Sequence, residues 1–289
     1  MYVKGSRGVM KASIKFWGVR GSIACPSPQH VIYGGNTSCV EVVVGDHHVI
    51  LDAGTGIRNL GACPSNRGVD HFTLLMTHTH WDHIFGFPFF APAYNPKVRL
   101  DVFAGHLSSN GGIRHLLASQ MSDPMFPVPL ENLQSQKTFT DFEAGETFVL
   151  DKSGIKIRTA PLNHPNGATG YRLEAQGQAV CYVTDTEHIP GRPDENILRL
   201  IEGADYVIYD STYTEEELPN RVGWGHSTWE EGVRLCQRAG AKNLVLFHHD
   251  PDHDDAFMAD LEVKTKQVWE GCLIARDGLE IDLDPASSC

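Results

Sequence analysis

The sequence has 289 residues, of which 41% are hydrophobic, and its formal net charge is −12. This length is sufficient for one large domain or two small ones with a sizeable core. The acidic balance disfavours a long nucleic acid as partner, because such molecules are bound mainly through Lys and Arg. No run approaches the ~20 apolar residues that span a bilayer, so a membrane is not expected either.

The cysteines and the first residues favour a cytoplasmic location. Seven cysteines are present, an odd number without a C-x-x-C pair, which argues against a disulfide framework and against a thiolate zinc site. Residues 1–12 carry scattered positive charge without an apolar signal core and are interpreted as a loose leader. No low-complexity linker or long repeat interrupts the remainder, so residues 13–289 are expected to form a single domain.

Short β-rich runs alternate with helical stretches along the chain, which predicts an α/β protein. The expected strands are residues 13–17, 38–44, 48–52, 72–77, 98–103, 155–160, 170–174, 179–184, 205–210, 243–248 and 279–283. The expected helices are residues 82–92, 110–121, 194–202, 228–239 and 254–269. Ser227 or Thr228 can cap the fourth helix, and Glu230 and Glu231 suit its first turn. Residues 104–146 are less regular and are expected to form a loop and short-helix excursion that overhangs a site.

The stretch THTHWDHIFG at residues 77–86 places three histidines and an aspartate within six positions. In a helix, residues two apart point roughly 200° away from each other, whereas in an extended segment they face the same side. Because the stretch follows the apolar run FTLLMT, His78 and His80 are expected to bind one ion together. Asp82 and His83 are adjacent, are expected to diverge, and so suit a second ion. Ligands of these types favour Zn²⁺, Mn²⁺ or Fe²⁺.

Three later apolar runs also end in a side chain that can bind metal. His164 ends IKIRTAPLNH, Asp185 ends AVCYVTD, and His248 ends NLVLFH. A lone histidine or aspartate at such a place is more often structural, and the first cluster has its own alternative as a surface loop or a helix start capped by Asp82. Together, however, these residues favour a metal site. The strand pattern favours His248 over its neighbour His249 as the ligand.

The pattern H-x-H-x-D-H at residues 78–83 resembles the signature of the metallo-β-lactamase superfamily, and the resemblance extends over residues 13–284. It implies a four-layer αβ/βα sandwich with two metal ions at the sheet edges, zinc first among the candidates. The resemblance assigns one ion to His78, His80 and His164, a second to Asp82, His83 and His248, and the bridge between them to Asp185. The segment LDAGTG at 51–56 also resembles the family, and Asp52 is expected to support the ligand loop.

The stretch GWGHSTWEEG at residues 223–232 bears on the substrate. Its G-H-S-T motif resembles the tRNA 3′-processing endonucleases (tRNase Z) and related small phosphodiesterases, and the lactamase and glyoxalase branches lack it. YDSTY at 209–213 resembles the acidic segment of the same branch, with Asp210 where the endonucleases usually have Glu. The resemblance implies that Asp210 orients and charges His226. The alternative is a capping Ser or Thr beside an incidental histidine.

Two features separate this sequence from the tRNA-processing enzymes. It lacks their long, basic, glycine- and proline-rich arm, since residues 105–137 contain only Arg114 and Lys137 as cations. Its opening segments, 16–28 and 33–42, resemble bacterial metallo-hydrolases described as cyclic-nucleotide phosphodiesterase-like. There Arg20, Asn36 and Thr37 either reach a substrate or belong to a glycine-rich turn with a capping asparagine.

These features predict a dinuclear metal-dependent hydrolase, a phosphodiesterase acting on a small nucleotide or cyclic nucleotide through a bridging hydroxide. Asp82 is expected to accept a proton, and His226, held by Asp210, to protonate the leaving oxygen. The expected partner is a small phosphodiester, and the sequence leaves open whether the protein forms a homodimer. The alternatives are a hydrolase of lactones, thioesters or β-lactams, a tRNA 3′-processing endonuclease, and a non-catalytic metal or nucleotide sensor.

Overall fold

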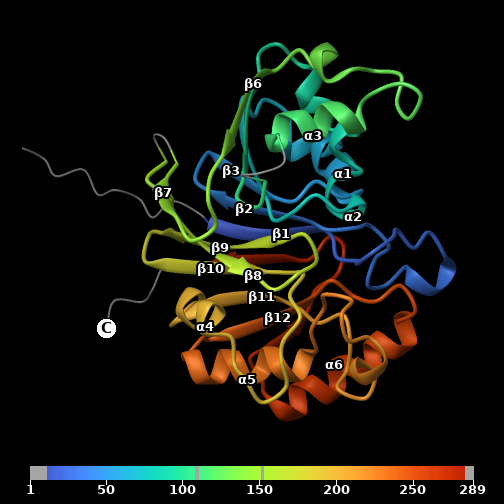
Figure 1. The fold of residues 1–289 in the computed structure, drawn as a ribbon, viewed down its shortest axis with the longest axis vertical. Coiled ribbons are helices and arrows are strands. Elements are labelled where there is room, and N and C mark those ends of the chain that lie inside the picture. Colours follow the sequence, from blue (N-terminus) through green and yellow to red (C-terminus); the bar gives the residue numbers. More distant parts are fainter. Residues whose placement is uncertain (1–11, 108–110, 151–152, 284–289) are drawn as a thin grey trace, which may run out of the picture.

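Two mixed β-sheets face each other, and helices cover the outer face of each (Figure 1). This arrangement comes from a computed structural model that describes residues 12–107, 111–150 and 153–283. It confirms the predicted four-layer sandwich. The leader predicted at residues 1–12 falls almost entirely outside the described residues.

The first sheet has the order β14-β1-β2-β3-β4-β5-β6. Its strands are β1 (Ala12–Gly18), β2 (Cys39–Val44), β3 (His47–Leu51), β4 (His71–Met76), β5 (Arg99–Ala104), β6 (Gln136–Asp141) and β14 (Glu280–Leu283). Strands β3 to β6 run parallel to one another, whereas β14, β1, β2 and β3 pair antiparallel.

The second sheet has the order β13-β12-β11-β10-β9-β8-β7. Its strands are β7 (Thr147–Val149), β8 (Lys156–Leu162), β9 (Ala168–Ala175), β10 (Gln178–Val183), β11 (Tyr206–Asp210), β12 (Asn243–Phe247) and β13 (Cys272–Ile274). Strands β10 to β13 run parallel and β7 to β10 antiparallel, so each sheet is half parallel.

The helices form the two outer layers. They are α1 (Gly56–Ala62), α2 (Trp81–Ile84) and α3 (Gly112–Gln120) on the first sheet, and α4 (Glu195–Ile201), α5 (Trp229–Ala239) and α6 (Asp255–Val268) on the second (Figure 1). The predicted cap of α5 is confirmed, because the Thr228 side chain accepts a hydrogen bond from the Glu231 amide. The helix ends at Gly240 in the left-handed conformation, as is common at helix C-termini.

Alternating side chains divide the core into three parts. On β2, Val40 and Val42 face the second sheet and meet residues such as Tyr182 and Phe247, whereas Cys39 packs under the first helical layer. This period of two buries one face of each strand between the sheets and the other beneath helices. The strands are consequently held from both sides, which fixes the positions of the loops at their ends.

Local sequence signals explain where the observed elements differ from the predicted ones. The helix predicted at 82–92 is only the single turn α2, followed by the 3-10 helices Phe87–Phe89 and Ala91–Tyr94, because Gly86, Pro88 and Pro92 interrupt a regular helix. The excursion predicted at 104–146 contains α3 and also β6, the edge strand of the first sheet. The prediction also missed α1, β7 and β13.

The carboxyl ends of the parallel strands lie at one edge of the two sheets. Strand β4 leads to His78, β10 to Asp185, β11 ends at Asp210 and β12 leads to His248. Ligands in α/β proteins commonly bind outside the carboxyl ends of parallel strands. Among the described residues, no helix has both the length and the apolar character needed to cross a membrane.

Candidate metal centre

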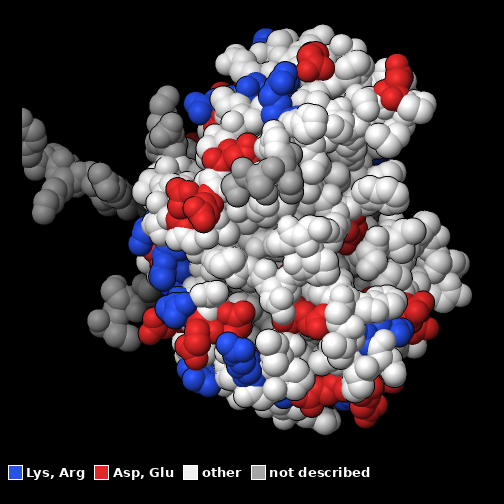
Figure 2. Space-filling view, viewed as in Figure 1, with Lys and Arg blue, Asp and Glu red and all other residues white. Residues whose placement is uncertain are grey.

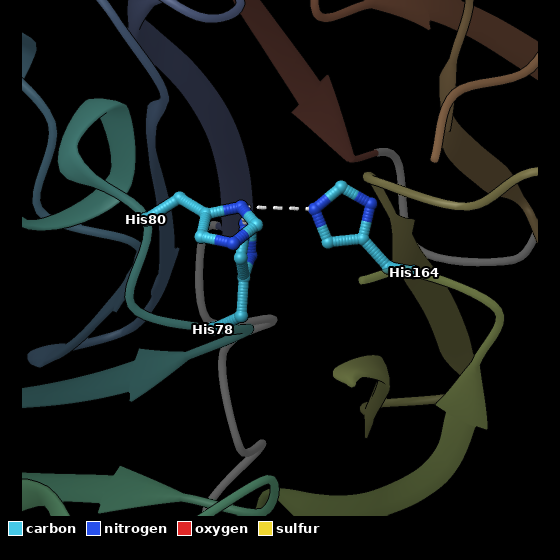
Figure 3. Close-up of side chains that lie close together, drawn as sticks. All are labelled: His78, His80 and His164. Atoms are coloured by element: carbon cyan, nitrogen blue, oxygen red, sulfur yellow. Dashed lines mark hydrogen bonds between the residues drawn. The ribbon is translucent and has the colours of Figure 1, made fainter. Parts of the chain in front are cut away.

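Three histidines meet at the carboxyl end of β4. His78 Nε2 lies 3.0 Å from His80 Nδ1, which lies 3.0 Å from His164 Nε2 (Figure 3). Burial lowers the pKa of all three imidazoles, most strongly that of His78. A neutral imidazole keeps a nitrogen lone pair, which is the form that binds metal. The predicted proximity of His78 and His80 is present, with His164 arriving from the loop after β8.

A second group of ligand-competent atoms lies beside the first. Asp82, His83, Asp185 and His248 are all buried, and each offers one atom within 4.8 Å of the others. Asp82 Oδ2 is 3.3 Å from both His83 Nε2 and His248 Nε2. The expectation that Asp82 and His83 diverge is therefore wrong: the imidazole of His83 is long enough to bring its Nε2 back beside the neighbouring carboxylate.

Asp185 lies between the two groups. Its Oδ1 is 3.7 Å from His78 Nε2 and 3.4 Å from His248 Nε2, and its Oδ2 is 3.2 Å from His83 Nε2. Burial would raise the pKa of this carboxyl, but the imidazoles of His248 and His83 hold it well below its usual range. The side chain is thus an anion whose Oδ1 lies between the two groups and whose Oδ2 lies beside the second.

The donor set fits divalent cations. Within the described residues, every ion pair of Asp52, Asp82, Asp185 and Asp210 is with a histidine, and none is with Lys or Arg. Buried carboxylates without a cationic partner are costly. Burial would lower the pKa of His83, whereas the carboxylates of Asp185, Asp82 and Asp52 raise it well above its usual range.

Asp52 supports the ligand loop, as predicted. It accepts hydrogen bonds from the Thr77 amide at 2.8 Å, the Thr77 hydroxyl at 2.8 Å and the Tyr182 hydroxyl at 3.1 Å. Its Oδ2 also lies 2.8 Å from His83 Nδ1, so the His83 ring donates there and turns Nε2 toward the centre. Such contacts fix the tautomer and orientation of a ligand histidine.

The pair Asp210 and His226 lies next to this cluster. His226 Nδ1 is 3.1 Å from Asp210 Oδ2 and 3.8 Å from Asp185 Oδ1. Burial alone would lower the pKa of His226, but the carboxylates of Asp210 and Asp185 raise it to about 9. The imidazole is therefore protonated at neutral pH, with Nδ1–H directed at Asp210.

Two hydroxyl groups complete this part of the centre, and the sequence reasoning missed both. Thr212 Oγ1 lies 2.6 Å from Asp210 Oδ1 and 3.0 Å from His248 Nδ1, which orients His248 as Asp52 orients His83. Ser227 Oγ lies 2.8 Å from His188 Nδ1 and 2.9 Å from the Tyr209 hydroxyl. Both residues belong to motifs already noted, YDSTY and GHST, in which Asp210 and His226 carry the more obvious chemical signal.

The loop after β1 closes the centre from another side. The Ser22 amide donates to Asp82 Oδ2 at 2.7 Å. A Cβ on Gly21 would lie 2.4 Å from the His248 ring, so only glycine allows this approach. Ser22, Asp52, Asp185 and His248 all have φ near +60°, a strained conformation for residues other than glycine that clusters at functional sites.

Arg20, Asn36 and Thr37 do not reach a substrate site. Arg20 is fully buried, and its guanidinium donates to the carbonyls of Gly34 and His253. The Asn36 side chain donates to Asp277 and the Thr37 hydroxyl accepts from the Thr55 amide. Of the two alternatives, the structure favours the glycine-rich turn, but Asn36 does not cap a helix: it contacts Asp277 and the Thr55 hydroxyl.

His249 is also separate from the centre. It is buried, and its Nε2 lies 2.8 Å from the Ala275 carbonyl oxygen. His248, not His249, is the histidine that the structure brings to the cluster. The choice based on the strand pattern therefore agrees with the structure.

Known proteins share this fold and sequence pattern. Residues 47–249 match the family described as Beta-lactamase superfamily domain. A Ribonuclease Z from Haloarcula marismortui is 25% identical over 320 aligned positions, which cover 94% of this chain and 96% of that protein. Among solved structures, the metallo-beta-lactamase fold protein YhfI from Bacillus subtilis superposes with a TM-score of 0.72 at 17% identity, covering 95% of this chain and 100% of that chain.

A diphosphatase from the PhnP family superposes with a TM-score of 0.67 at 19% identity, covering 94% of this chain and 98% of that chain. Identities this low show a shared fold alone, whereas the family match spans most of the sequence and includes the histidine cluster. The chain belongs to the metallo-β-lactamase superfamily, as a hydrolase of that fold with a histidine–aspartate cluster able to bind divalent metal.

Proposed function

We propose that this protein is a phosphodiesterase that acts on a small nucleotide or cyclic nucleotide at a dinuclear metal centre. The observation that carries the proposal is the Asp210–His226 pair, which lies beside the metal-competent cluster and contributes a protonated imidazole. A ribose alkoxide is a poor leaving group and needs a proton donor, whereas a strained β-lactam or a thioester has less need of one.

The proposed ligands of the first ion are His78, His80 and His164. Those of the second are Asp82, His83 and His248, with Asp185 between the two ions. The position of Asp185 supports its place between the two sets, since its Oδ1 lies near both His78 and His248 and its Oδ2 lies near His83. Imidazole and carboxylate donors without thiolates favour Zn²⁺, with Mn²⁺ or Fe²⁺ as alternatives.

When bound, such ions lower the pKa of water to about 7 and neutralise the oxygens of a phosphate. The side chains of the protein orient the reacting groups and transfer the protons. Asp82 is ionised, because His83 and His248 offset the effect of burial and hold its pKa well below the usual range. Its carboxylate can therefore accept a hydrogen bond from the attacking water, and we assign it the role of proton acceptor. His226, protonated and held by Asp210, donates a proton to the leaving oxygen.

The similarity to proteins named Ribonuclease Z supports phosphodiester chemistry and makes tRNA 3′ processing the second candidate. The charge distribution favours the small substrate. Residues 105–137 contain only two cations, and the whole chain has 36 acidic against 24 basic residues. A protein that grips a folded RNA normally presents many Lys and Arg side chains to its phosphates.

One substrate panel tests the proposal. The protein is loaded with Zn²⁺ or Mn²⁺ in turn and assayed with 2′,3′- and 3′,5′-cyclic nucleotides, bis-(p-nitrophenyl) phosphate, precursor tRNA, a lactone and a β-lactam. We expect turnover of the cyclic nucleotides and of bis-(p-nitrophenyl) phosphate and, by elemental analysis, two ions per chain. Turnover of the lactone or β-lactam alone would contradict the proposal, and cleavage of precursor tRNA in preference to cyclic nucleotides would favour the second candidate.

A further inference from the structure

The residues before His226 form a loop that lies against a proposed metal ligand. We call residues 221–225, with the sequence RVGWG, the tryptophan loop. The side chains of Val222 and Trp224 are 69% and 60% exposed, whereas Gly225 is buried. A Cβ on Gly225 would lie 2.4 Å from His164 Nδ1, so only glycine allows the loop to approach this ring. The loop therefore belongs to the surroundings of the centre, and the proposed function gives it no role.

One carbonyl group of the tryptophan loop orients His164. The Gly225 carbonyl oxygen lies 2.8 Å from His164 Nδ1. A carbonyl oxygen can only accept a hydrogen bond, so Nδ1 carries the proton and Nε2 keeps its lone pair. Nε2 is the nitrogen that lies 3.0 Å from His80 Nδ1 in the cluster (Figure 3). The orientation of this proposed ligand therefore depends on where the loop lies.

The tryptophan loop also leads directly into the proposed proton donor. His226 follows Gly225 in the sequence, and the ring centroids of His226 and His164 are 5.4 Å apart. Asp210 fixes the His226 ring through Nδ1, at 3.1 Å, but the backbone that carries this ring continues from the loop. A displacement of the loop would therefore move a metal ligand and the proton donor together.

A single carboxylate holds the tryptophan loop. The Gly223 amide donates to Glu187 Oε1 at 3.0 Å and to Oε2 at 2.8 Å, and the Gly225 amide donates to Oε2 at 2.8 Å. Both glycines have a φ of +87°, which L side chains rarely adopt and which permits the two amides to converge on one side chain. Hydrogen bonds to an ionised acceptor are about twice as strong as those between neutral groups. In the described part of the chain, no other side chain accepts a hydrogen bond from the amides of this loop.

Glu187 is itself fixed between two ligand segments. It lies two residues after Asp185, and its amide donates to the Asn163 carbonyl at 2.8 Å. The Asn163 side chain donates back to the Glu187 carbonyl at 2.7 Å, and Asn163 directly precedes His164. Acidic side chains are scattered over the face of the molecule shown in Figure 2, so a partly exposed carboxylate alone indicates no function. The contacts of Glu187 with both the ligand segments and the tryptophan loop distinguish it.

We propose that Glu187 is a positioning residue, which holds the tryptophan loop so that Gly225 orients His164 for metal and His226 faces the leaving oxygen. Its role towards His226 rests on the proposed function, whereas its role towards His164 needs only a metal site. Glu187 acts through the amides of the loop and not through the reacting atoms. The position of its acceptor oxygen is accordingly more important than its negative charge.

Three variants separate the acceptor from the charge. Glu187→Gln keeps an acceptor oxygen at the same length without the charge, whereas Glu187→Asp keeps the charge on a side chain that is one methylene shorter. Glu187→Ala lacks both. Glu131→Ala is the matched control, because it removes a carboxylate that is 63% exposed and paired with Arg114, away from the centre.

The first test requires neither metal nor turnover. Amide hydrogen exchange at Gly225 is measured by NMR in the metal-free full-length protein, and thermal unfolding confirms that each variant is folded. We expect Glu187→Ala and Glu187→Asp to accelerate this exchange by about tenfold or more, since a hydrogen bond to a charged group is lost. Glu187→Gln and Glu131→Ala should stay near wild type. Unchanged exchange in Glu187→Ala would overturn the proposal.

The second test measures metal binding itself. Removing the partner of a ligand histidine typically lowers metal affinity ~10- to 100-fold. Glu187→Ala and Glu187→Asp should weaken the binding of one Zn²⁺ ion by such a factor, in competition with a chelating dye, and should alter the visible spectrum of the Co²⁺-loaded protein. Glu187→Gln should stay near wild type in both measurements. The opposite order, with Glu187→Asp near wild type and Glu187→Gln weakened, would overturn the proposal because charge would then be the property that matters.

Kinetics at saturating Zn²⁺ separate failure of this inference from failure of the proposed function. Glu187→Ala should lower kcat more for a cyclic nucleotide than for bis-(p-nitrophenyl) phosphate, because a displaced His226 matters only where the leaving oxygen needs a proton. Equal losses with both substrates would overturn the role of Glu187 towards His226. Absence of phosphodiesterase activity in wild type would refute the proposed function, while amide exchange and Zn²⁺ affinity would still decide the role towards His164.

Discussion

His226 differs from the other histidines of the centre because it belongs to neither proposed ligand set and is nevertheless held by a buried carboxylate, Asp210. Asp210 Oδ2 lies 3.1 Å from His226 Nδ1, and Asp210 is itself oriented by the Thr212 hydroxyl. The ring therefore keeps its second nitrogen, Nε2, for another partner. A histidine fixed in this way is suited to donating a proton to a substrate oxygen.

Replacing this residue should affect substrates according to their leaving group. We expect His226→Ala to retain the bound metal and to lose ~10²- to 10⁴-fold in kcat for a cyclic nucleotide, the range typical of a lost general acid. With a p-nitrophenyl ester the loss should be about tenfold or less, since nitrophenolate leaves without protonation. Steady-state kinetics with both substrates and elemental analysis check this prediction.

The comparison between leaving groups is the internal control. Equal losses with both substrates would remove His226 from the role of acid. Asp210→Asn keeps the size of the side chain but removes its charge, and should therefore show the same leaving-group dependence to a smaller degree. A metal content below that of wild type in His226→Ala would instead indicate that the residue is a ligand.

At the scale of elements, the turns after the strands determine the geometry of the centre. Asp52 follows β3, Asp185 follows β10 and His248 follows β12, and each has φ near +60°. The chain leaves each strand through a strained turn that aims a side chain at the sheet edge. The cost of such a conformation, ~1–3 kcal/mol per residue, is offset by the surrounding hydrogen bonds.

Asp52 offers a test of these turns. Asparagine tolerates positive φ better than most residues, so Asp52→Asn should keep the backbone while weakening the contacts to Thr77 and His83. We expect the affinity for Zn²⁺ to fall ~10- to 100-fold, the usual effect of removing the partner of a ligand histidine. Competition with a chelating dye measures this affinity. Tyr182→Phe removes only the hydroxyl contact to Asp52 and should cause a smaller loss; an unchanged affinity in Asp52→Asn would contradict the role.

The sequence predicted this part of the molecule well because each ligand-competent residue follows a strongly apolar strand. His78, Asp185 and His248 were found in this way, since an apolar run that ends in His or Asp is visible without any structure. The elements that were missed lack that signal. Strand β6 has the sequence QKTFTD and lies at a sheet edge, and α1 contains two glycines, so their structure depends on tertiary packing.

The same limit applies to side chains. The contact of Thr212 with His248 joins residues 36 positions apart, and no local pattern distinguishes it from any threonine after a strand. Arg20 is a substrate candidate on sequence because its segment resembles metallo-hydrolases, whereas its guanidinium in fact donates to the His253 carbonyl, 233 positions away. Chemical type can be deduced from sequence, but the direction in which a side chain points requires the fold.

At the scale of the whole molecule, the centre joins the two sheets. His78, His80, Asp82 and His83 follow β4 in the first sheet, while His164, Asp185 and His248 follow strands of the second. Metal bound by both groups would link the two halves of the sandwich directly. A ligand that binds only the folded state stabilises it, by ~4 kcal/mol at a thousandfold excess over its Kd.

Removing metal should therefore lower the stability of the whole chain. We expect a chelator to lower the Tm by about 10 °C, since ~1 kcal/mol corresponds to ~2–4 °C in chains of 150–250 residues. Thermal unfolding before chelation, after it, and after Zn²⁺ is restored measures the shift. Asp185→Ala should show a smaller decrease in Tm on chelation, because it lacks the side chain between the two groups. Val263→Ala, which changes an exposed side chain on α6, should show the same decrease as wild type. An unchanged Tm after chelation would show that bound metal does not hold the two sheets together.

The pairing of β14 with β1 bears on how the protein is made. Strand β1 is the first described element of the chain and β14 the last, and they are neighbours in the first sheet. On the ribosome, β1 therefore presents an open hydrogen-bonding edge until residues 280–283 have been translated. Open edges invite pairing with other chains. Premature termination shortly before β14 would thus leave the metal ligands intact and yet produce a chain inclined to associate through β1.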